Sequence, residues 1–95
     1  MEKIENQNQA YELRQPFAEW LRERNIYDVL PENVVITGDT VENFIHYQNT
    51  KIFKQYSFPK NHQFYGFKFY DLYSRKKHIH IYLLDVGNYR LCYIS

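Results

Sequence analysis

The amino-terminal quarter of the chain carries apolar residues at helical spacing. Phe17, Trp20 and Leu21 follow one another at i, i+3 and i+4, which places them on one face of a helix over about residues 5–24. Pro16 lies inside this stretch, and proline fits the first turn of a helix but disrupts its middle. The pattern therefore predicts an N-terminal helix that is kinked or broken near Pro16.

The middle of the chain combines two predicted strands with a segment of ambiguous pattern. Residues 33–37 are rich in β-branched side chains and predict a short strand, as do residues 50–58. Between them, Val41 and Phe44 have helical spacing, although the β-branched and aromatic content of residues 40–48 would also suit a strand. We favour a short helix there, and the strand stays the alternative.

The last third of the chain alternates apolar and polar residues with the period of a β-strand. This alternation predicts strands over residues 64–73, 78–84 and 89–94, separated by a basic loop and by a turn at Gly87. Short connections between successive strands favour antiparallel neighbours. We therefore expect a single α+β domain of residues 1–95, in which the N-terminal helix packs on an antiparallel sheet ending in a three-stranded C-terminal meander.

Both faces of this predicted sheet carry large side chains. Ile79, Ile81 and Leu83 form the apolar row on which we expect the N-terminal helix to dock. Tyr70 and Tyr82 are expected on the other face, which then needs a second layer, a subunit or a ligand. A homodimer that buries this face and a monomer that keeps it free are both compatible with the pattern.

The composition is that of a small globular protein. Of the 95 residues, 44% are hydrophobic and 19% aromatic, which is enough for a real core and excludes a disordered or low-complexity chain. No apolar run approaches the roughly 20 residues that a membrane-spanning helix needs, so no membrane association is expected. The first residues show no secretory signal, and Cys92 has no cysteine partner. We expect a cytoplasmic protein in which Cys92 is a buried apolar residue.

The charge is distributed unevenly along the chain. Residues 1–48 hold four Lys and Arg against nine Asp and Glu, whereas residues 49–95 hold eight against two. The second half also holds twelve of the eighteen aromatic residues. A basic and aromatic half often marks a surface with a preferred partner, although packing of the two halves would cancel part of the field.

A candidate binding surface follows from this asymmetry. Three adjacent cations in a predicted loop cannot belong to the core, and Tyr and Arg are frequent at binding hot spots. The predicted binding residues are Arg75, Lys76, Lys77, Tyr70, Tyr73, Tyr82 and Arg90. A protein partner is expected first. Nucleic acid is the alternative, because cations contact phosphates and flat rings stack on unpaired bases.

Catalytic and metal-binding motifs are scarce. His78 and His80 are two residues apart and could ligate a metal from one face of a strand, but His46, His62, Asp71 and Asp85 offer no third ligand at a diagnostic spacing. No nucleophile motif, phosphate-binding glycine loop or paired-cysteine zinc pattern is present in the sequence. We therefore predict no catalytic residues, no metal and no cofactor, and a binding protein rather than an enzyme.

One short segment resembles a known family. Residues 86–94, Val-Gly-Asn-Tyr-Arg-Leu-Cys-Tyr-Ile, resemble the strand pair of bacterial toxins of the RelE/ParE type, which are small basic proteins that cleave ribosome-bound mRNA or poison gyrase. The resemblance implies that Arg90 is the strand arginine and that Tyr93 is an aromatic residue on the active-site side.

Two functions are therefore carried forward. The first is a small non-catalytic binding protein that binds and modulates a host protein or nucleoprotein through a basic, Tyr-rich sheet surface. A composition rich in Asn, Lys, Tyr and Ile, as in this chain, is common in phage and mobile-element proteins that bind and inhibit a host machine. The alternative is a small ribonuclease-like toxin.

Overall fold

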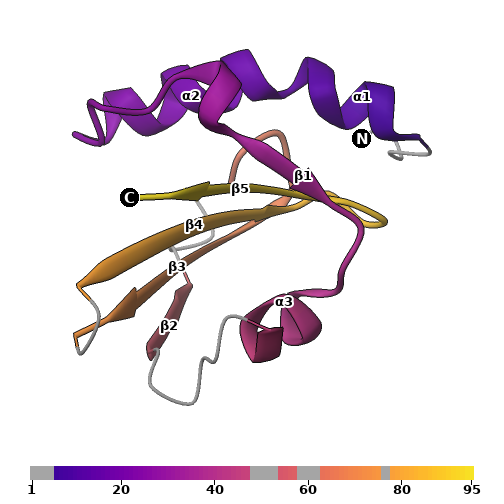
Figure 1. Ribbon diagram of the computed structural model, residues 1–95. Helices are drawn as coiled ribbons and strands as arrows, with labels where there is room; N and C mark the ends of the chain where they lie inside the picture. The colour runs from indigo at the N-terminus through magenta and orange to yellow at the C-terminus, as the bar shows by residue number, and fades with distance from the viewer. Residues whose placement is uncertain (1–5, 48–53, 58–62, 76–77) are drawn as a thin grey trace.

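The structure is a computed structural model that describes residues 6–47, 54–57, 63–75 and 78–95. Within these ranges five antiparallel strands form one sheet, in the order β1-β5-β4-β3-β2, flanked by three α-helices (Figure 1). The strands are β1 (Val35–Thr37), β2 (Lys54–Ser57), β3 (Lys68–Ser74), β4 (Ile79–Asp85) and β5 (Arg90–Ile94). The helical segments are α1 (Gln7–Glu12), α2 (Arg14–Glu23), the 3-10 turn η1 (Pro31–Asn33) and α3 (Val41–Tyr47). The α+β class and the C-terminal meander of β3, β4 and β5 are confirmed.

The N-terminal helix is broken, as its proline predicts. Leu13 joins the two segments, closing α1 and preceding the first residue of α2. Pro16 is the third residue of α2 and has no N–H to donate to the carbonyl four residues earlier, so a continuous helix through Glu12 would lack one bond. Asn6 caps α1 by accepting a hydrogen bond from the Gln9 amide at 3.0 Å.

The ambiguous middle segment is a helix. The side-chain oxygen of Thr40 accepts a hydrogen bond from the Asn43 amide at 3.1 Å, which caps the first turn of α3. Val41 and Phe44 point from this helix into the molecule and are buried. Of the strand predicted over residues 50–58, only Lys54–Ser57 lies within the described ranges, as β2.

The strand predicted over residues 64–73 begins later than expected. Phe64 and Phe67 pair across a two-residue turn, and the Phe67 amide donates to the Phe64 carbonyl at 2.8 Å. Tyr65 and Gly66 have φ values of 49° and 80°, the left-handed pair of a tight hairpin turn. Gly66 therefore belongs to this turn, and β3 starts at Lys68.

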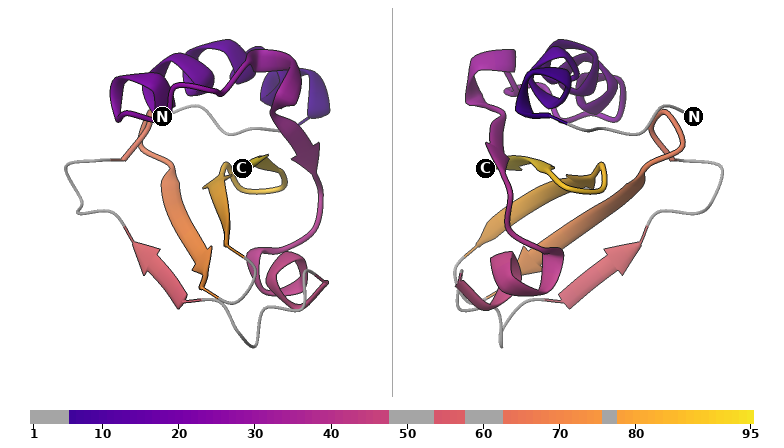
Figure 2. Two further views of the ribbon diagram at one scale, coloured as in Figure 1. Left: turned by 60° about the vertical axis from the view of Figure 1, so that its left-hand side comes forward. Right: turned by 90° about the vertical axis from the view of Figure 1, so that its right-hand side faces the viewer.

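Helices cover both faces of the sheet. In Figure 2, α1 and α2 lie over one face, whereas α3 lies against the other. The larger core forms under α1 and α2, and its fully buried side chains include Phe17, Leu21, Leu84 and Leu91. The second core forms under α3 around Leu72. No helix among the described residues is long and apolar enough to cross a membrane.

The prediction of the sheet face on which the N-terminal helix docks was wrong. Ile81 and Leu83 pack in the second core under α3, whereas α2 docks on the opposite face of β4, which carries Tyr82 and Leu84. Both faces of β4 are buried, so the alternation of its side chains could not identify the helix face. Aromatic contacts distinguish the two faces, because Trp20 of α2 packs edge-on against Phe69 with ring centroids 4.8 Å apart.

Candidate functional site

Four aromatic rings form a continuous stack on the face of the sheet that α1 and α2 also cover. We call this stack the aromatic column; it consists of Tyr93, Tyr82, His80 and Tyr73. Neighbouring ring centroids are 6.2, 5.4 and 4.3 Å apart along the column, with interplanar angles of 17°, 5° and 28°. Strand register builds the column, because Tyr82 is paired with Tyr93 on β5 and His80 with Tyr73 on β3.

The aromatic column passes from the core to the surface. Tyr93 and Tyr82 are 6% and 8% exposed and belong to the core under the N-terminal helices. The His80 side chain is 38% exposed, and Tyr73 is half-buried. Figures 1 and 2 show the reason, since the ends of β3 and β4 at residues 74 and 79 extend away from the layer of α1 and α2. Two rings are thus held by the core while the other two meet solvent.

A carboxylate orients the histidine of the aromatic column. The Nδ1 atom of His80 lies 3.1 Å from Oδ1 of Asp71, which is two residues before Tyr73, the partner of His80 on the neighbouring strand β3. The Asp71 side chain is 24% exposed, so the pair is partly shielded from water. A carboxylate that bonds one ring nitrogen of a histidine fixes the ring orientation and leaves the other nitrogen for an external group.

The environment of Tyr82 disfavours its ionised form. Burial, followed by the negative charge of Asp71 and the neighbouring Tyr93, raises the pKa of the Tyr82 phenol from 10.0 to about 12. The ring therefore stays neutral over the physiological range. Tyr82 supports the aromatic column as a packed, uncharged ring rather than as a proton donor or acceptor.

The structure separates the residues of the predicted binding surface. Tyr73 and Tyr82 both belong to the aromatic column, and Arg75 is exposed directly after β3. Lys76 and Lys77 lie outside the described residues. Tyr70 lies on the opposite face of the sheet, where it packs against the core under α3. The expectation that Tyr70 shares a surface with the other two tyrosines is therefore corrected.

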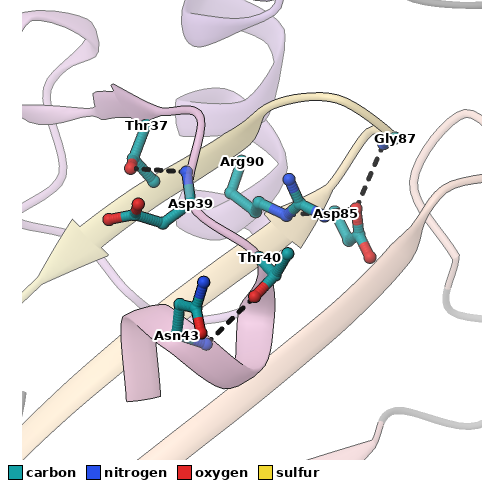
Figure 3. A network of polar contacts seen from close by, with 7 residues as sticks. All are labelled: Thr37, Asp39, Thr40, Asn43, Asp85, Gly87 and Arg90. Carbon is teal, nitrogen blue, oxygen red and sulfur yellow. Dashed lines mark hydrogen bonds and ion pairs between the residues drawn. The ribbon is translucent and has the colours of Figure 1, made fainter. Parts of the chain in front are cut away.

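Arg90 is a structural residue at the other end of the sheet. It is 8% exposed, and its Nε atom lies 3.4 Å from Oδ1 of its cross-strand partner Asp85 (Figure 3). The same Asp85 oxygen accepts a hydrogen bond from the Gly87 amide at 3.1 Å, which ties the pair to the β4–β5 turn. Thr37 of β1, paired with Arg90, begins the connection to α3. Arg90 is thus buried between its backbone partners on β1 and β4, at the end of the sheet away from Arg75.

Neither His78 nor Cys92 adds chemistry to the site. His78 is exposed, precedes β4 and has a φ of 54°, so it does not continue the strand alternation that would pair it with His80. No group of three His, Cys, Asp or Glu side chains within the described ranges is placed to hold a metal ion. Cys92 is buried in the core under α3, and this burial raises the pKa of its thiol to about 12.

Comparison with protein-family models, curated proteins and solved structures finds no match for this chain. The β4–β5 hairpin that carries the resemblance to RelE/ParE-type toxins is present as an antiparallel pair. Its two residues of interest, Arg90 and Tyr93, are both buried. The functional argument therefore rests on the aromatic column and its surroundings.

Sequence reasoning missed the partnership between Asp71 and His80. The sequence singled out both residues only as possible metal ligands. Nothing in the sequence placed them next to each other, because they are nine residues apart and separated by a loop. The register between β3 and β4 brings them together. The sequence does not show this register, because it depends on where the loop between the two strands begins and ends. A polar Asp and His among apolar strand residues was the signal that could have drawn attention to them.

Proposed function

We propose that this chain is a small non-catalytic binding protein that binds and modulates a host protein or nucleoprotein. Its binding surface is the exposed end of the aromatic column, formed by Tyr73 and His80, together with Arg75 and the basic loop after β3. One observation carries this proposal: the column links two partly exposed rings to the hydrophobic core through Tyr82 and Tyr93. Rigid aromatic groups lose little conformational entropy when a partner binds, which is why they serve as hot spots.

Charge supports the same surface. Residues 49–95 carry eight Lys and Arg against two acids, and both of those acids are engaged in the structure. Asp71 contacts His80, and Asp85 contacts Arg90. Neither acid of residues 49–95 therefore neutralises Arg75, and Arg75 would attract an acidic protein surface or a phosphate backbone.

Affinity capture from host lysate tests the proposal, with and without nuclease. The site variant combines Tyr73→Ala with Arg75→Ala, and the matched control combines Tyr27→Ala with Lys68→Ala, which removes one exposed tyrosine and one exposed cation elsewhere. We expect the wild type and the control to retain the same partner. The site variant should bind it at least ~10-fold more weakly, as hot-spot truncation does.

Equal retention of the partner by the site variant would overturn the proposal, provided that both variants unfold at temperatures close to that of the wild type. The nuclease arm shows whether the retained partner is held directly or through nucleic acid. Homodimerisation through this surface would appear as self-capture, which the same pair of variants tests.

A ribonuclease-like toxin is the second candidate, favoured by the orientation of His80 by Asp71. An imidazole whose Nδ1 contacts a carboxylate is a usual general base in catalysis. This function predicts that induced expression stops growth and that His80→Phe relieves the arrest. Normal growth at high expression, with intact cellular RNA, would count against it.

A further inference from the structure

The proton on the His80 ring is assigned by its neighbour. A carboxylate can only accept hydrogen bonds, so the Nδ1 atom that lies 3.1 Å from Asp71 carries the proton of the neutral ring. The Nε2 atom then has a free lone pair and acts as a hydrogen-bond acceptor. It makes no hydrogen bond to any residue in the described ranges, and the side chain is 38% exposed.

This acceptor is held in place by the neighbours of the ring. Tyr73 stacks on the imidazole with a centroid distance of 4.3 Å, and the ring of Tyr82 lies nearly parallel to it at 5.4 Å. With Asp71 at the ring edge, rotation of the imidazole would break a hydrogen bond and two stacking contacts. His80 therefore presents one acceptor atom in a fixed direction, beside a partly exposed aromatic ring and close in sequence to Arg75.

A ribonucleotide offers the groups that match this arrangement. An unpaired base stacks on an aromatic ring, phosphates bind cations, and the ribose 2′-hydroxyl can donate to an acceptor. The 2′-hydroxyl is the donor that DNA lacks, so a fixed acceptor next to a stacking ring distinguishes the two nucleic acids. An acidic protein surface would use the cation and the rings but has no particular need of this acceptor.

We propose that the exposed end of the aromatic column binds single-stranded RNA and selects it over DNA. In this proposal, which rests on the binding function proposed above, an unpaired base stacks on Tyr73 and the 2′-hydroxyl of its ribose donates to Nε2 of His80. Arg75 contacts a neighbouring phosphate. Asp71 does not touch the RNA and is a positioning residue, because it fixes the tautomer of His80.

The test compares fluorescein-labelled oligouridylate and oligodeoxyuridylate of ten nucleotides by fluorescence anisotropy at pH 8 and several salt concentrations. Loss of one well-placed hydrogen bond predicts that the wild type binds the RNA about 10-fold more tightly than the DNA. Tyr27→Ala, which removes an exposed tyrosine elsewhere, should behave as the wild type does. A gel of the recovered RNA shows whether it stays intact.

The variants separate stacking from sugar recognition. His80→Phe keeps a flat ring in the column but removes the acceptor, so the preference for RNA should fall to about one while DNA affinity is retained. Asp71→Asn, whose amide can donate to Nδ1 as well as accept from it, should lower the preference in the same direction. Tyr73→Ala should weaken the binding of both oligonucleotides by roughly 5- to 100-fold, because the stack of a base on this ring is lost.

Two results would overturn this inference: an RNA preference that His80→Phe leaves unchanged, or no binding of either oligonucleotide at 100 mM salt. In the latter case, nuclease-resistant capture of a host protein that still depends on Tyr73 and Arg75 would leave the proposed binding function standing. RNA selection through His80 without any effect of the Tyr73 and Arg75 changes on host capture would instead refute the proposed function alone.

Discussion

At the scale of single residues, burial governs the chemistry of Cys92. The residue is 3% exposed and lies in the core under α3, where burial raises the pKa of the thiol to about 12. Only the thiolate reacts with disulfide reagents. We therefore expect Cys92 to be unreactive toward a chromogenic disulfide in the native protein and to react stoichiometrically in denaturant. Rapid labelling of the native protein at pH 8 would contradict this packing.

Tyr82 gives the protein a predictable response to alkaline pH. Its phenol has a pKa of about 12 in the folded state and 10.0 when unfolded, so the folded state favours the neutral ring. The associated stability is complete below pH 10 and is lost as pH rises from 10 to 12, to an extent on the order of 2 kcal/mol. Denaturant titrations at pH 9, 10 and 11 measure this loss. Tyr82→Phe should show a smaller decrease over the same interval, and an equal decrease would exclude Tyr82 as its source.

At the scale of elements, the β4–β5 turn depends on one glycine. Gly87 has a φ of 99°, a conformation that residues with a Cβ rarely adopt. Apart from its chain neighbours, no atom of the described residues lies within 4 Å of the Cβ that alanine would add. Gly87→Ala should therefore cost about 1–3 kcal/mol through backbone strain alone.

Gly38 provides the matched control for that substitution. In the part of the chain that the structure describes, an added Cβ at Gly38 also meets nothing within 4 Å beyond its chain neighbours, and the φ of Gly38 does not lie in the left-handed range. Gly38→Ala should leave the free energy of unfolding unchanged or raise it slightly, because alanine restricts the unfolded chain. Equal effects of the two substitutions in chemical denaturation would rule out strain at Gly87.

Helix α2 is attached to the sheet by its aromatic side chains. Trp20 packs against Phe64 and Phe69, with centroid distances of 5.5 and 4.8 Å, and the Arg24 guanidinium covers the indole at 3.8 Å. Because the indole is only partly buried, Trp20→Ala should cost about 3 kcal/mol, at the low end for such a change. Denaturant unfolding measures this cost, with the exposed Glu19→Ala as control; a change below 1 kcal/mol would refute the packing.

The sequence predicts a feature of these elements well when residues within the same element determine it. Pro16 acts within its own helix, and Gly87 within its own turn, so both features could be anticipated. The face on which α2 docks could not, because both faces of β4 are apolar and only contacts with Phe69 across the sheet distinguish them. The Asp71–His80 pair was hidden for the same reason, since strand register created it.

At the scale of the whole molecule, helices cover both faces of the sheet. The N-terminal helices pack over the face that carries Tyr82, and Val41 and Phe44 of α3 pack over the face that carries Leu72 and Leu83, so the expected reason for dimerisation is removed. We expect a monomer of 11.7 kDa in sedimentation experiments at micromolar concentration. A dimer that persists in the Tyr73→Ala variant would indicate an interface away from the aromatic column.

The strand order has a consequence for how the molecule is made. Among the described strands, β1 lies at the edge of the sheet and pairs with β5, which is 53 or more residues later in the chain, so this edge cannot form until β5 has been synthesised. The apolar face of α2 is likewise covered by residues of β3, β4 and β5. A nascent chain that has emerged as far as α3 has helical segments but no surface on which to bury them. The apolar face of the N-terminal helices therefore stays exposed during synthesis until the later strands have emerged from the ribosome.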